Sequence, residues 1–149
     1  YGARKYDRMH RAFSFSVKVT TIVLLVLGAA GFVFAEPVVT LFRRSDPEVI
    51  RIGTETFRVQ ILTVWTWGFI TLSNMYTQAI GYGIRSTILA AARQGLFLIP
   101  TLLVLPNVWG LRGLEICQPL ADVLTLALAV WMMTKVIRTQ KAQMAQETA

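Results

Sequence analysis

Hydrophobic residues along this chain gather into long runs without a charged side chain. The uncharged runs cover residues 19–35, 59–84, 94–111 and 123–134, and the last grows to 19 residues when it is counted back across Asp122 to Ile116. An α-helix rises about 1.5 Å per residue, so a hydrocarbon core about 30 Å thick requires roughly 20 residues. The pattern predicts an all-α integral membrane segment with four transmembrane helices, at about 13–35, 58–82, 87–108 and 114–135.

Two other interpretations of these runs fit less well. A helix of a soluble bundle has one apolar stripe with charges opposite, whereas residues 19–35 and 94–111 carry no charge on any face. The first run also resembles a signal peptide, because basic residues precede an apolar stretch. Its 17 uncharged residues exceed the usual apolar region of such a peptide, and three further hydrophobic segments follow. A spanning helix is therefore the better interpretation.

Composition agrees with a membrane protein. Hydrophobic residues make up 54% of the chain and charged residues 15%, against about 25% charged residues in a typical soluble domain. The net charge of +7 is compatible with nucleic-acid binding or with basic loops beside a membrane. No nucleic-acid motif and no basic stripe interleaved with aromatic residues is present, so we expect no nucleic-acid partner.

The distribution of Lys and Arg predicts the orientation of the helices. Ten of the fifteen lie in a basic loop at 1–12, near the start of the first helix, near the connection between the second and third helices, or at the end of the fourth helix (Lys135) and in the tail at 136–149; the other five lie on the opposite side. Basic residues concentrate on the cytoplasmic side. We expect both ends of this segment to be cytoplasmic, in the plasma membrane of a bacterium.

Prolines predict where the helices end or bend. Pro37 should end the first helix, because its ring removes a backbone donor and clashes with the preceding turn. In the outer connector, Asp46 is a candidate N-cap, and Pro47 suits the first position of a short helix that leads into the second span. Pro100 and Pro119 should kink the third and fourth spans.

Asp122 is the most costly polar group in the predicted membrane core. An ionised carboxylate there costs several kcal/mol unless it is paired, hydrated or protonated. A carboxylate that gains and loses a proton during a cycle would serve a proton-coupled transporter. The alternative is that Asp122 only accepts hydrogen bonds from neighbouring helices.

A polar stripe follows the second predicted span. Trp67, Thr71, Asn74 and Gln78 are spaced by four, three and four residues, so they share one helix face. Such a face turns towards protein or water rather than lipid. It either lines a water-filled substrate cavity or forms hydrogen bonds between helices, and Trp67 itself is expected to pack or to form a cavity wall.

Other polar residues near the helices have simpler expected roles. Gln118 precedes Pro119, and either Gln118 or a water can satisfy the carbonyl of Glu115 that the proline leaves without a donor. Arg93 can extend its side chain to the cytoplasmic headgroups. Gly28 and Gly31 allow close packing of helices. The sequence contains no phosphate loop, nucleophile elbow or pair of metal ligands, so we expect neither an enzyme nor a resident cofactor.

Five segments together resemble one family of transporters. They are YGARKYDRMHRAF, FRRSDPEVIRIGTETFRV, QAIGYGIRS, RQGLFLIPTLLVLP and GLRGLEICQPLADVLT, and they resemble, in order, the last four of the twelve helices of the multidrug and toxin extrusion (MATE) family. The resemblance implies a two-lobe, secondary-active exporter of lipophilic cationic small molecules that works by alternating access, in exchange for H⁺ or Na⁺. It also implies that this chain is a fragment whose partners include further N-terminal helices of the same polypeptide.

The resemblance leaves questions open about coupling and substrate. Some family members carry a coupling carboxylate in the helix that matches residues 59–84, which contain no acidic residue here. Coupling would then depend on Asp122 or on carboxylates in the missing helices, and we expect Asp122, Asn74, Gln78, Thr71 and Gln118 to form the substrate or ion pathway. A lipid-linked sugar flippase of the same fold and a non-transporting membrane scaffold are the alternatives.

Overall fold

The computed structural model describes residues 6–42 and 47–147, and within these ranges all regular structure is helical. The order of elements is α1 (Tyr6–Val33), α2 (Ala35–Phe42), α3 (Pro47–Ile61), α4 (Val64–Ala79), α5 (Gly83–Ala91), the π-helical turn η1 (Ala92–Leu96), α6 (Leu98–Trp109) and α7 (Leu111–Glu147). The predicted all-α fold is confirmed.

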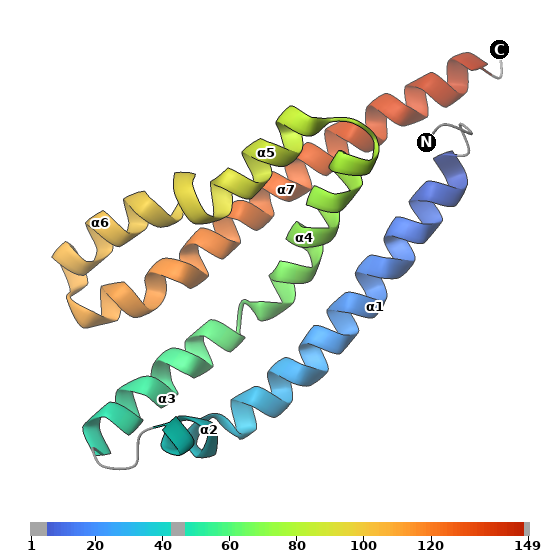
Figure 1. Cartoon of the computed structure of the whole chain (residues 1–149). Coiled ribbons are helices and arrows are strands. Elements are labelled where there is room, and N and C mark those ends of the chain that lie inside the picture. The colour runs from blue at the N-terminus through green and yellow to red at the C-terminus, as the bar shows by residue number, and fades with distance from the viewer. Residues whose placement is uncertain (1–5, 43–46, 148–149) are drawn as a thin grey trace.

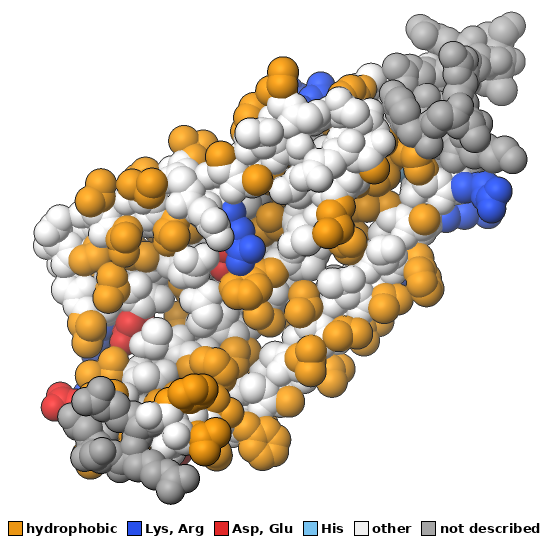
Figure 2. All heavy atoms as spheres, in the orientation of Figure 1, with side chains coloured by type: hydrophobic (Ala, Val, Ile, Leu, Met, Phe, Trp, Pro, Cys, Tyr) orange, Lys and Arg blue, Asp and Glu red, His pale blue; other side chains and the backbone are white. Residues whose placement is uncertain are grey.

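Three helical segments of the described residues are long and apolar enough to cross a membrane. They are Arg8–Val33, Gly83–Trp109 and Leu111–Ala142. Large apolar side chains lie exposed along them, among them Val26, Leu103 and Val123, and many hydrophobic side chains lie open on the face drawn in Figure 2. An exposed surface of this kind suits contact with lipid or with further helices.

The second predicted span is not one continuous helix. The expectation of a single helix over 58–82 is wrong, because α3 ends at Ile61 and α4 begins at Val64. At this break the Thr63 hydroxyl donates to the carbonyl of Gln60 at 3.1 Å, and the Thr66 hydroxyl donates to the carbonyl of Thr63 at 2.7 Å. Such local hydrogen bonds compete with the regular helical ladder.

Proline positions explain two other helix boundaries. Pro37 offers no N–H to the carbonyl of Val33, four residues earlier, and α1 ends at Val33. The chain then forms α2, which sequence reasoning did not predict. Pro100 likewise offers no donor to Leu96, and the third span is interrupted just there by η1, where the amide of Phe97 donates to the carbonyl of Ala92 at 2.9 Å.

Other expectations about the connectors have mixed outcomes. α3 begins at Pro47 as predicted, whereas Asp46, the candidate cap, lies outside the described residues. Pro119 lies inside α7, which continues through it without a break. α7 also continues as a helix into the predicted tail, where Val136 and Gln140 are buried.

Two helix pairs, α6 with α7 and α1 with α4, are joined where α4 packs on α7 (Figure 1). α6 and α7 form a tight antiparallel hairpin around Gly110, whose φ of 57° favours glycine. A Cβ atom at Gly113 would overlap the backbone carbonyl of Leu105, so the two helices approach closely. α1 packs along α4, and α4 packs on α7. The start of α1 and the end of α7 lie at the same end of the molecule.

Small residues allow the contact of α1 with α3 and α4. Gly28 faces Ile61 and Val64, and Gly31 faces Ile61, so the predicted packing role of these glycines is confirmed. Apolar side chains of α4, α5 and α7, including Ile70, Leu89 and Met132, form one buried cluster. This cluster holds α7 against α4 and α5.

Candidate functional site

Asp122 lies in the middle of the described helices with its side chain fully buried. Its residue is 0% exposed. One carboxylate oxygen, Oδ2, accepts a hydrogen bond from the indole Nε1 of Trp67 at 2.7 Å. The other, Oδ1, accepts from Nε of Arg93 at 3.1 Å and from the side-chain amide of Gln118 at 3.3 Å. Donors from α4, η1 and α7 therefore converge on one charge, as a buried carboxylate requires. We call these four residues the Asp122 cluster.

Arg93 occupies a different place from the one predicted. It does not extend to the headgroups, because its side chain is 22% exposed and forms an ion pair with Asp122. Its guanidinium carbon also lies 4.4 Å from the centre of the Trp67 ring, a geometry in which the ring face attracts a cation. The opposite charge of Asp122 outweighs the pull of the distant headgroups, since a paired buried ion avoids most of its desolvation penalty.

Two other members of the cluster also differ from expectation. Trp67 is predicted to pack or to form a cavity wall, and the structure adds a role that the prediction did not include: its indole N–H donates a hydrogen bond to the carboxylate of Asp122. Of the two candidates for the carbonyl of Glu115, Gln118 or a water, Gln118 is engaged elsewhere, because its side-chain amide donates to Asp122, one helical turn later. Sequence spacing could have suggested this last contact, because residues i and i+4 of a helix are neighbours.

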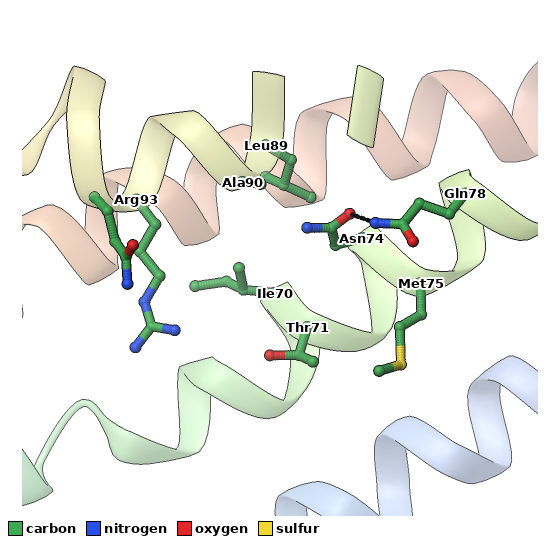
Figure 3. A pocket seen from close by; sticks show the side chains of 9 residues that line it. Ile70, Thr71, Asn74, Met75, Gln78, Leu89, Ala90 and Arg93 are labelled. Carbon is green, nitrogen blue, oxygen red and sulfur yellow. Dashed lines mark hydrogen bonds between the residues drawn. The ribbon is translucent and has the colours of Figure 1, made fainter. Parts of the chain in front are cut away.

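The rest of the predicted polar stripe borders a cavity. A cavity of about 320 Å³ lies between α4 and the α5–η1 segment, and we call it the α4–η1 cavity (Figure 3). Thr71, Asn74 and Gln78 line it from α4, and Arg93 and Gln94 line it from η1. The amide of Gln78 donates to Oδ1 of Asn74 at 2.9 Å. The remaining lining is apolar: Ile70, Met75, Leu89 and Ala90.

The structure thus brings the predicted site residues together in two adjoining groups. Asp122 and Gln118 belong to the buried cluster, whereas Thr71, Asn74 and Gln78 belong to the cavity. Arg93 belongs to both, and in Figure 3 it lies at the opposite end of the cavity from the bonded pair of Asn74 and Gln78. Sequence reasoning missed this linking role, because Arg93 and Asp122 are 29 residues apart.

The chemistry available here is that of ions and hydrogen bonds. The described residues contain no group of three or more His, Cys, Asp or Glu side chains placed to hold a metal ion. The arrangement offers one neutralised ion pair next to a small cavity with both amide and apolar walls. Such a site can bind a small molecule and can respond to the charge state of one carboxylate.

A buried hydrogen bond outside this site also escaped sequence reasoning. The Tyr76 hydroxyl donates to Oε1 of Gln140 at 2.9 Å, and both residues are buried. This contact fixes the end of α4 against α7 beyond the predicted fourth span.

Comparison with known proteins places these observations in context. The family model named MatE matches residues 1–104. A solved structure named protein A superposes with a TM-score of 0.83 and 31% sequence identity over 91% of this chain. The chain spans 30% of the length of that protein. No match was found among curated proteins.

Proposed function

This chain belongs to the MatE family of multidrug and toxin efflux transporters, and from that premise we propose that it contributes to a secondary-active exporter. In the proposal, lipophilic cationic small molecules leave the cell in exchange for H⁺ or Na⁺, by alternating access between two lobes. The family is one of transporters rather than enzymes. The three membrane-spanning helices fit a multi-pass membrane protein, which we place in a bacterial plasma membrane with both ends of this segment cytoplasmic.

The observation that carries the proposal is the fully buried carboxylate of Asp122. A buried charge inside a membrane protein is costly, and such residues mark ion pathways and proton relays. Asp122 joins α4, η1 and α7 through three hydrogen bonds. A proton or cation that replaces these contacts would weaken the junction of the three elements, and a change of this kind can bias one conformation over another.

The α4–η1 cavity supports a role in contact with the transported molecule. Small-molecule sites are mostly apolar with a few polar groups that fix orientation. Ile70, Met75 and Leu89 supply apolar surface, while Asn74 and Gln78 supply amide groups. A volume of about 320 Å³ lies at the lower end of the range for such sites, about 300–1,000 Å³, so this cavity would hold a small molecule or one part of a larger one.

The alternative functions receive less support from these residues. A lipid-linked sugar flippase needs several cations to hold its phosphate groups, and Arg93 is the one cation among the residues that line the α4–η1 cavity. A non-transporting scaffold does not require a cavity with amide and apolar walls next to a buried ion pair. We therefore retain the exporter as the proposed function.

The experiment is gradient-driven export of a lipophilic dye by the full-length transporter in inverted vesicles. Asp122→Asn should reduce export to the background, while membrane insertion and expression stay at the wild-type level. Glu115→Gln is the matched control, because Glu115 lies on the same helix and accepts from Thr56 outside the cluster. Wild-type export rates in Asp122→Asn would exclude the coupling role, and absence of export in the unmodified protein would exclude the exporter.

A further inference from the structure

The charge that the α4–η1 cavity experiences depends on a residue outside it. Arg93 is the one charged side chain among the nine that line the cavity, whereas Asp122 is fully buried behind it. With Asp122 ionised, the two charges cancel at an Nε–Oδ1 distance of 3.1 Å. An arginine stays protonated at any physiological pH, so the balance changes only when Asp122 changes.

We propose that Arg93 transmits the protonation of Asp122 to the cavity as a positive charge, and that this charge expels a bound lipophilic cation. The carboxylate takes one proton from water and becomes a neutral carboxylic acid, while the guanidinium keeps its charge. The site then changes from net zero to +1. Proton and cationic substrate thus exclude one another, which is the requirement for antiport. This inference rests on the proposed function and gives it a specific coupling residue.

Two contacts of Arg93 fit this role. Its ion pair uses Nε, and the described part of the chain offers no hydrogen-bond partner to its two terminal nitrogens, which remain free to act on the cavity. The Trp67 ring lies against the guanidinium with 4.4 Å between its carbon and the ring centre. When Asp122 loses its charge, this cation–π contact still holds the guanidinium beside the cavity.

No other charged group in the described ranges takes part in the pair. α4 and α6 contain no charged side chain, and α5 contains only Arg85, eight residues before Arg93. On α7, Glu115 accepts from Thr56 of α3 at 3.1 Å and Lys135 lies over the Trp131 ring. Asp122 is thus the acidic partner that sets the net charge of the pair, and the prediction concerns a single proton.

A pair of second-site variants tests this transmission in the purified full-length transporter, reconstituted without any ion gradient. The measured quantity is equilibrium binding of N-methylquinolinium, a permanent aromatic cation, with quinoline as an uncharged ligand of similar shape at neutral pH. Asp122→Asn imitates the protonated carboxyl and should weaken binding of the cation about tenfold, or about 1.4 kcal/mol. Adding Arg93→Gln should restore binding to within about threefold of wild type, whereas adding Arg93→Lys, which keeps the charge, should not.

The alternatives give different results. If Asp122 binds the cation directly, Arg93→Gln will not restore binding to Asp122→Asn, and the proposal is wrong. The proposal also fails if the wild type does not bind the cation, or if quinoline binding falls together with cation binding, since the cavity itself would then be damaged. Unchanged quinoline binding with restored cation binding supports it. Because no gradient is present, this result is separate from the export assay that decides the proposed function.

Discussion

The indole N–H of Trp67 lies 2.7 Å from Oδ2 of Asp122, so a tryptophan of α4 is directly bonded to a carboxylate of α7. The same ring lies against the guanidinium of Arg93. Trp67 therefore contacts both charges of the ion pair, one through its edge and the other through its face. From this double contact we expect the position of α4 to depend on the charge carried by α7.

Replacing Trp67 by phenylalanine separates these two contacts. Trp67→Phe keeps an aromatic face for Arg93 but removes the N–H donor to Asp122. Hydrogen bonds to charged groups contribute about 1.5–3 kcal/mol, so we expect a clear decrease of the melting temperature in detergent together with slower export. Trp65→Phe is the control, because Trp65 is 40% exposed and donates no hydrogen bond within the described residues. Equal melting temperatures for the two variants would show that the indole N–H contributes little.

The close approach of α6 and α7 gives a prediction about stability alone. Gly113→Ala would place a Cβ atom against the backbone carbonyl of Leu105, and backbone cannot move aside as a flexible side chain can. Overpacking of this kind costs about 1–3 kcal/mol, so the variant should melt at a lower temperature and accumulate to a lower level. Gly83→Ala is the matched control, since a Cβ atom there meets nothing within 4 Å. Identical thermal melts would mean that the hairpin adjusts freely.

Sequence patterns predicted the parts of this fold that depend on local chemistry. The long apolar runs predict helices because every residue contributes to the same signal, and Pro47 starts α3 where proline suits the first turn. The break at Leu62–Thr63 lies inside an apolar run, and the stretch 58–67 around it contains neither proline nor glycine. There the hydroxyl groups of Thr63 and Thr66 favour local hydrogen bonds, and a threonine on its own does not predict a helix break.

In the candidate site, the buried carboxylate could be predicted from the local sequence, whereas its hydrogen-bond partners could not. Asp122 could be singled out because a charge in an apolar run is costly wherever it lies. Its partners could not, since Trp67 and Arg93 are 55 and 29 residues away and are brought to it by tertiary packing. Arg93 lies near the start of a predicted span, where headgroup contact is the ordinary expectation, and the π-helical turn that carries it has no reliable sequence signal.

Water access to the polar stripe separates a transport pathway from a sealed helix contact. A cysteine at Asn74, in a Cys117→Ser background, should react with a membrane-impermeant maleimide, because Asn74 lines the α4–η1 cavity. Cys117 itself is buried and its replacement removes the native thiol of the chain. Ser73→Cys is the matched control on the neighbouring residue, which is 0% exposed and should react at least about tenfold more slowly.

A bound lipophilic cation should protect Asn74→Cys from the reagent if the cavity forms part of the substrate pathway. Equal, slow labelling of both cysteines would indicate a dry contact between helices and would favour the scaffold over the exporter, because a sealed stripe leaves no route for a solute past α4.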